Sequence, residues 1–168
     1  ASGVVVVEVL PVNPLRMFFV RFDLRDHRKI AVIDRRIAYT GSMNIADPLY
    51  FKKDAGVGQW VDAMVRIEGP AAWVLEAVSL SLTSLQTGAH FAPQPMPQLP
   101  LAGSGQVQVF PSGPESAKVP IDAVLLAAIY AARREIVLTT PYFVPSPALL
   151  TAMRSAALRG VRVVLIVP

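Results

Sequence analysis

The chain lacks cysteine altogether, which excludes disulfide bonds and thiolate metal sites. It also lacks an apolar run of the roughly 20 residues that a bilayer-spanning helix requires. Only 17% of its 168 residues are charged, whereas 53% are hydrophobic, which is enough for one sizeable core or two small ones. The net charge of +4 suits anionic partners such as phospholipid head groups, phosphate esters or nucleic acid, without choosing among them.

Fifteen prolines and ten glycines divide the chain into short elements. In the first half, β-branched and alternating stretches predict strands at 3–10, 18–24, 27–34, 36–41 and 60–69. A helix follows from Pro70 to Gly88, with proline at its start and glycine at its end. The second half predicts strands at 106–110, 135–140 and 161–168, and helices at about 116–134 and from Ser146 to Gly160.

The organisation that we predict has three parts. Residues 1–87 form the C-terminal part of a first repeat, 88–105 a Pro/Gly-rich linker, and 106–168 the N-terminal part of a second repeat. The repeat is indicated by "SGVVVVEVLP" (2–11) and "RGVRVVLIVP" (159–168), which share Gly, three Val and the final Pro at matched positions. The chain is therefore expected to be a fragment of a two-repeat protein, and strand edges without partners are expected to promote association.

A histidine and a lysine two residues apart suggest chemistry on phosphate. His27 and Lys29 are expected to share one face of a strand, because side chains alternate along it. A neutral imidazole can attack phosphorus, and a lysine ammonium offers charge and three donors to phosphate oxygens. Ser42 and Asn44 follow with short hydrogen-bonding groups. No cluster with metal-ligand spacing is evident, so neither a metal nor another cofactor is expected; His90, alone in the linker, is expected to be solvated.

The full spacing is more specific than any of its parts. His27-x-Lys29, four residues, Asp34, six residues and then Gly41-Ser42-x-Asn44 resembles the HKD signature of the phospholipase D superfamily. The segments "RDHRKIAVID", "GSMNIAD", "WVDAMVRIEGPAA", "PSGP", "TTPYFVP" and "ALRGVRVVLIVP" are similar, in that order, to the bacterial cardiolipin synthase branch. The resemblance implies an α/β fold, a phospholipase D-like mixed sheet flanked by helices, here an incomplete two-repeat architecture.

The resemblance also implies roles for these residues. His27 would be the nucleophile that takes a phosphatidyl group from phosphatidylglycerol. Lys29, Asn44 and Ser42 would bind or support the phosphate at the Gly41 turn. Asp34 would be mainly structural. Asp62 would orient the histidine or else be an exposed strand carboxylate. Tyr142 and Phe143 would line a lipid cleft or pack in their own loop.

Three departures from the family pattern affect these expectations. Arg36 stands where the family's turn usually has glycine, so that turn is expected to be strained or differently shaped. Asp26 stands where the branch often has asparagine, and a carboxylate beside His27 could raise its basicity. The chain carries one HKD motif where family members use two, so the second half-site is expected in cis beyond Pro168 or in a second chain.

Three functions remain open at this stage. The first is a cardiolipin synthase-like phosphatidyltransferase working through a phospho-histidine, with phosphatidylglycerol as partner, no nucleic acid, and a parent protein at the bacterial cytoplasmic membrane through segments missing here. The second is a homodimeric phosphodiesterase acting on phospholipid or nucleic acid. The third is a non-catalytic module that binds anionic lipid or phosphate.

Overall fold

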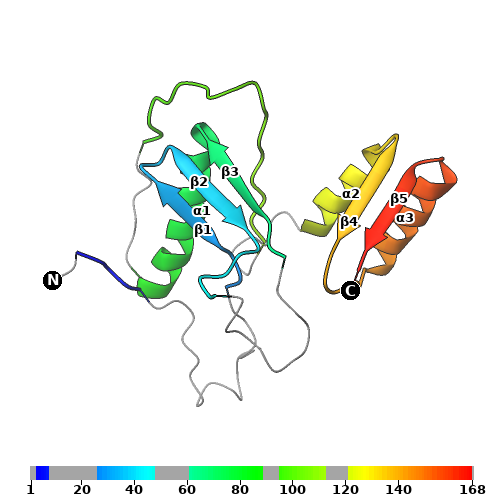
Figure 1. Cartoon of the computed structure of the whole chain (residues 1–168), viewed down its shortest axis with the longest axis horizontal. Helices are drawn as coiled ribbons and strands as arrows, with labels where there is room; N and C mark the ends of the chain where they lie inside the picture. The colour runs from blue at the N-terminus through cyan, green and yellow to red at the C-terminus, as the bar shows by residue number, and fades with distance from the viewer. Residues whose placement is uncertain (1–2, 8–25, 48–60, 89–94, 113–120, 168) are drawn as a thin grey trace, which may run out of the picture. The chain divides into compact units, whose positions relative to one another are not determined.

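The computed structural model describes residues 3–7, 26–47, 61–88, 95–112 and 121–167. These residues belong to two compact units, Ala1–Val109 and Phe110–Pro168 (Figure 1). The predicted strand at 18–24 and His90 lie outside the described residues. Each unit contains a small sheet with helical cover, which confirms the α/β class predicted from the sequence.

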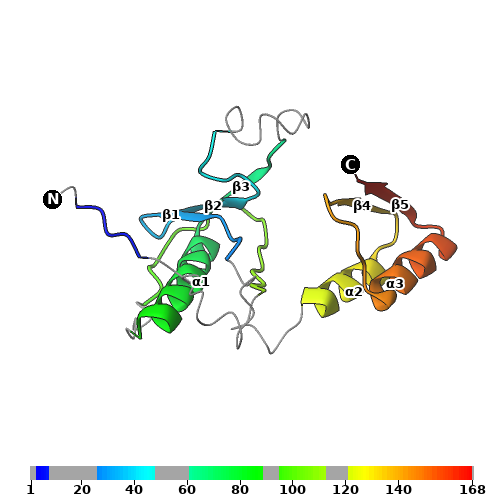
Figure 2. The same ribbon diagram turned by 90° about the horizontal axis from the view of Figure 1, so that it is seen from below.

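The first unit is an antiparallel sheet with a helix on one face. Its strands are β1 (Ile30–Ile33), β2 (Ile37–Gly41) and β3 (Met64–Glu68), paired in the order β1-β2-β3. Helix α1 (Pro70–Thr87) packs across one face of this sheet, as Figure 2 shows. The core consists of the buried residues Ala38, Ala72 and Leu75, with Ile30, Val32, Ile67 and Val109 packed against them.

Small side chains let the helix approach the sheet closely. Ala38 on β2 and Ala72 on α1 have no exposed surface. Pro70 occupies the first turn of α1, where its missing N–H costs no hydrogen bond. Gly88 ends the helix with φ 66°, and its N–H donates to the carbonyl of Ser84. Both ends of α1 agree with the sequence prediction.

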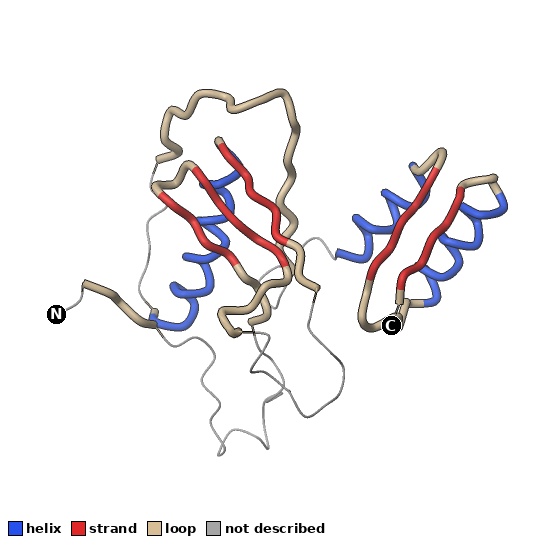
Figure 3. The backbone as a smooth tube through the Cα atoms, in the orientation of Figure 1, coloured by secondary structure: helices blue, strands red, loops and turns tan. Residues whose placement is uncertain are grey.

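The second unit is a β-α-β arrangement preceded by a helix. Parallel strands β4 (Glu135–Thr139) and β5 (Arg162–Ile166) are joined through α3 (Pro147–Leu158), and α2 (Ile121–Ala131) lies beside α3 on the same face (Figures 2 and 3). The buried core contains Ile129, Ala152, Met153, Ala156 and Val161.

The ends of α3 follow the local signals in the sequence. Ser146 caps its N-terminus by accepting a hydrogen bond from the N–H of Leu149 at 3.3 Å. Gly160 follows the helix with φ 84°. The guanidinium of Arg159 donates to the carbonyls of Ile129 and Tyr130 at 3.1 and 3.3 Å. Its positive charge therefore lies at the C-terminal end of α2, where the helix dipole is negative.

Two predicted strands are absent from the described residues. Residues 3–7 and 106–110 have no strand partner, and Val4, Val5 and Val6 are 72–87% exposed. The similar segment at 159–168 contains β5, which pairs with β4. Gly3 and Gly160 nevertheless share a left-handed backbone, with φ 70° and 84°. The valine-rich sequence therefore has strand propensity, but it forms a strand only where a neighbouring strand pairs with it.

Candidate active site

All of the candidate site residues except Asp34 belong to segments at one end of the β1-β2-β3 sheet. Ile30 pairs with Thr40, and Gly41 pairs with Met64. This register brings the residues before β1, after β2 and before β3 to the same end of the sheet (Figure 3). His27, Lys29, Ser42, Asn44 and Asp62 all belong to those three segments. Asp34 lies at the opposite end, in the β1–β2 hairpin.

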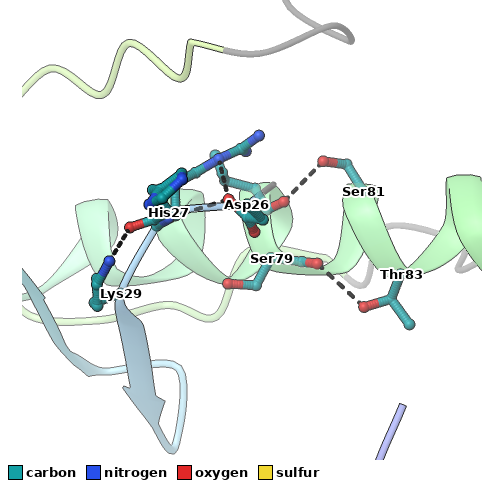
Figure 4. A network of polar contacts seen from close by, with 8 residues as sticks. Asp26, His27, Lys29, Ser79, Ser81 and Thr83 are labelled. Carbon is teal, nitrogen blue, oxygen red and sulfur yellow. Dashed lines mark hydrogen bonds and ion pairs between the residues drawn. The ribbon is translucent and has the colours of Figure 1, made fainter. Parts of the chain in front are cut away.

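His27 and Lys29 lie in extended residues just before β1. His27 is exposed and Lys29 is half-buried. The Lys29 ammonium donates to the backbone carbonyl of His27 at 2.7 Å, as Figure 4 shows. This contact keeps the cation beside the imidazole-bearing residue, where an incoming phosphate could replace the carbonyl as acceptor.

The carboxylate of Asp26 is engaged by Arg28. Asp26 Oδ1 accepts from the backbone N–H of Arg28 at 3.1 Å and forms an ion pair with its Nε at 3.2 Å (Figure 4). The sequence suggested that Asp26 could act on the neighbouring imidazole. The contacts favour a different role, in which Asp26 fixes the backbone that leads into His27.

Ser42 connects the second and third segments of the site. Its hydroxyl donates to Asp62 Oδ1 at 2.8 Å and accepts from the N–H of Ala63 at 2.9 Å. Its own N–H donates to the Ala63 carbonyl at 3.0 Å. The sequence did not predict that these backbone groups of Ala63 take part. Main-chain groups are the same in every residue type, so the neighbouring Gly41 was the one residue that marked this place.

The two remaining candidate residues are Asn44 and Asp34. Asn44 is exposed in the loop after β2. Asp34 and Arg35 form the hairpin turn with φ 52° and 58°, and the N–H of Arg36 donates to the Ile33 carbonyl at 3.0 Å. The turn that was expected to be strained or differently shaped therefore has its left-handed residues at Asp34 and Arg35.

A charge network lies at the hairpin end of the same sheet. Glu68 accepts from Arg66 at 2.8 Å and from Arg36 at 3.2 Å. The hydrogen bond from Arg66, followed by the one from Arg36, holds the pKa of the Glu68 carboxyl below its ordinary value of about 4.5. Since this network lies at the other end of the sheet from His27, Lys29 and Asp62, we assign it to the stability of the sheet and not to the site.

The second unit holds an apolar groove of about 480 Å³ between α2, β4 and the loop that follows β4. Tyr142, Phe143 and Val144 line this groove together with Leu149 and Met153. Tyr142 and Val144 are 84% and 90% exposed. This loop, predicted either to line a lipid cleft or to pack on itself, therefore presents apolar side chains to the surface.

Neither a metal-binding cluster nor a membrane-spanning helix occurs in the described part of the chain. Those residues include no group of three or more His, Asp or Glu side chains placed to hold a metal ion. None of the helices formed by the described residues combines the length and apolar character needed to cross a membrane.

Comparison with known proteins agrees with the signature. No family model matches the chain. It is 50% identical to cardiolipin synthase A of Serratia proteamaculans (strain 568), and 51% identical to the cardiolipin synthases A of Yersinia pseudotuberculosis serotype O:1b and Yersinia pestis bv. Antiqua (strain Angola). Each alignment covers 99% of this chain but 35% of the relative, so the chain spans about a third of these proteins. Over nearly its whole length the chain is thus similar to part of the cardiolipin synthases A, in agreement with the resemblance of its HKD signature to the phospholipase D superfamily.

Proposed function

We propose that this chain carries one half-site of a cardiolipin synthase-like phosphatidyltransferase. The observation that carries the proposal is the convergence of His27, Lys29, Ser42, Asn44 and Asp62 at one end of a sheet, through the pairings of Ile30 with Thr40 and of Gly41 with Met64. A nucleophile, a cation and neutral donors at one place are what phosphoryl transfer needs.

The reaction would proceed in two displacements. In the first, an imidazole nitrogen of His27 bonds to the phosphorus of one phosphatidylglycerol, and the bond from phosphorus to glycerol breaks. The departing glycerol takes a proton from an acid in the second half-site. In the second, a hydroxyl of another phosphatidylglycerol attacks the phospho-histidine, loses its proton to that same group, and frees His27. The product is cardiolipin, and no cofactor is consumed.

The remaining groups would stabilise the charge that develops on phosphate. Lys29 would exchange its hydrogen bond to the His27 carbonyl for one to a phosphate oxygen. Asn44 would donate its amide N–H to the same group. Asp62 would orient the imidazole through its second ring nitrogen. The second half-site would come from a second HKD repeat in cis or from a second chain, and the substrate would be drawn from an anionic membrane surface.

The experiment places this segment in a longer relative. A chimera of the Serratia enzyme, with its matching residues replaced by this chain, is incubated with phosphatidylglycerol in detergent micelles. Cardiolipin and glycerol are expected in equal amounts. His27→Gln is expected to lower kcat by about 10⁴-fold or more, because it removes the nucleophile. His90→Gln, which changes the chain's other histidine, is the matched control and is expected to leave activity intact.

Other outcomes would select other functions. An inactive chimera that is folded would contradict the proposal. Turnover by the isolated 168-residue chain, abolished by His27→Ala, would indicate that two chains combine their single motifs. Phosphate binding that survives His27→Ala but not Lys29→Ala, without turnover, would indicate a binding module.

A further inference from the structure

The hydroxyl of Ser42 has already used its one proton. A serine hydroxyl has one donor and two acceptor positions. In this structure the proton points to Asp62 Oδ1 at 2.8 Å, and the oxygen accepts from the N–H of Ala63 at 2.9 Å. A phosphate oxygen is an acceptor only, so it could bind Ser42 solely by displacing Asp62 from that proton.

The backbone fixes Ser42 in this arrangement. The Ser42 N–H donates to the Ala63 carbonyl at 3.0 Å, so residues 42 and 63 are joined in both directions. Gly41 packs against the same carbonyl without room for a side chain. These contacts hold the Ser42 oxygen in front of Asp62, the residue immediately before Ala63.

The Asp62 carboxylate is bound at one oxygen. Among the described residues, Ser42 is the one side chain that hydrogen-bonds this carboxylate, and it engages Oδ1. No donor from the described part of the chain engages Oδ2, which can accept a further hydrogen bond. A carboxylate anchored at one oxygen has a fixed direction at the other, which is the arrangement used to orient an imidazole N–H.

We infer that Ser42 is a positioning residue for Asp62 and is not a phosphate ligand. The inference rests on the proposed function, in which Asp62 orients the nucleophilic histidine. It divides the Gly41-Ser42-Met43-Asn44 segment into two tasks: Ser42 fixes the carboxylate, while Asn44 remains available for phosphate. The two roles of Ser42 make different predictions, because a positioning residue acts only through its partner.

The test is a double-mutant cycle in the active chimera. Ser42→Ala and Asp62→Asn are each expected to lower kcat by about 10- to 100-fold with KM within about twofold of the unmodified value. Adding Ser42→Ala to Asp62→Asn is expected to cost less than about twofold more, because the partner is already lost. Ser42→Thr keeps the hydroxyl and is expected to retain most of the activity. Ser81→Ala removes a hydroxyl from α1 and sets the baseline.

Several results would overturn the inference. Losses that multiply in the double variant, or a rise in KM caused by Ser42→Ala alone, would make Ser42 an independent phosphate ligand. A loss for Ser42→Thr equal to that for Ser42→Ala would show that the hydroxyl is not what matters. An inactive unmodified chimera would refute the proposed function instead. In that case the same cycle would be measured as unfolding free energies of the 168-residue chain, for the parent, Ser42→Ala, Asp62→Asn and the double variant. Absence of coupling between Ser42 and Asp62 in these free energies would refute their pairing.

Discussion

The Cα of Gly41 lies so close to the backbone of Ala63 that no side chain fits between β2 and the start of β3. A Cβ built on Gly41 would meet the Ala63 carbonyl oxygen and would lie 2.9 Å from the Cα of Met64. We therefore expect Gly41→Ala to push the strands apart at the end of the sheet next to His27, Lys29 and Ser42. The unfolding free energy should fall by about 1–3 kcal/mol, as for other overpacked sites, when measured by urea denaturation.

A second glycine provides the control for that prediction. Gly103 has open space around the position of a Cβ and no left-handed backbone. Gly103→Ala should therefore change the unfolding free energy by less than about 0.5 kcal/mol. Equal effects at the two positions would show that the close approach at Gly41 is not a constraint on the fold.

Local signals in the sequence were enough to predict the ends of α1 and α3, whereas α2 ends at Ala131 and not at the predicted 134. Pro70 and Gly88 bound α1, and Ser146 and Gly160 bound α3, because capping depends on residues a few positions apart. Residues 3–7 and 106–110 have the composition of strands but no strand neighbour among the described residues. Pairing depends on distant segments, so composition alone could not predict it.

The same distinction applies to the site. The spacing from His27 to Asn44 fits a hairpin that returns the chain to its starting end and leaves Asp34 at the turn. It did not predict that Ser42 would donate to Asp62, or that Asp26 would be engaged by Arg28. Those contacts depend on side-chain directions and on backbone groups, which the spacing of residue types does not specify.

The hairpin turn provides a prediction about strain. Arg35 has φ 58°, which costs a residue with a side chain about 1 kcal/mol, and its Nε lies 3.2 Å from Glu76 Oε1. In Arg35→Gly, relief of strain should offset the lost ion pair, and the unfolding free energy should change by less than about 0.5 kcal/mol. In a Glu76→Gln background the ion pair is already absent, so the same substitution should be stabilising.

The neighbouring position distinguishes strain from a general effect of glycine. Arg36 has no left-handed backbone, and it pairs with Glu68 at 3.2 Å. Arg36→Gly should therefore lower the unfolding free energy by about 1 kcal/mol, through backbone entropy and the lost contact. If Arg35→Gly were the more damaging of the two substitutions, the left-handed assignment of this turn would be wrong.

Acid stability should depend on Glu68. The hydrogen bond from Arg66, and then that from Arg36, lower the pKa of Glu68 in the folded chain below about 4.5. A carboxyl with a lowered pKa binds fewer protons in the folded state than in the unfolded state. Its stabilising contribution is therefore complete above about pH 4.5 and is lost as the pH falls through the lower folded value. Glu68→Gln should flatten the decline of unfolding free energy over that acid range.

The two arginines are matched controls for this pH dependence. Arg66→Gln should reproduce most of the flattening, because its hydrogen bond is the largest cause of the lowered pKa. Arg36→Gln should reproduce a smaller part. An acid decline that is equally steep in the parent chain and in Glu68→Gln would mean that other carboxyls control stability there.

The apolar loop of the second unit makes a prediction about lipid. Val144 is 90% exposed and lines the groove beside Tyr142 and Phe143, whereas Leu158, also 90% exposed, lies at the end of α3 and outside the groove lining. If the groove receives the acyl part of the substrate, Val144→Ser should raise KM for phosphatidylglycerol in the chimera by about 3- to 10-fold through lost apolar contact. Leu158→Ser removes equally exposed apolar surface and should leave KM unchanged. A lowered melting temperature for Val144→Ser, with KM unaffected, would instead indicate that this loop packs against protein and does not contact lipid.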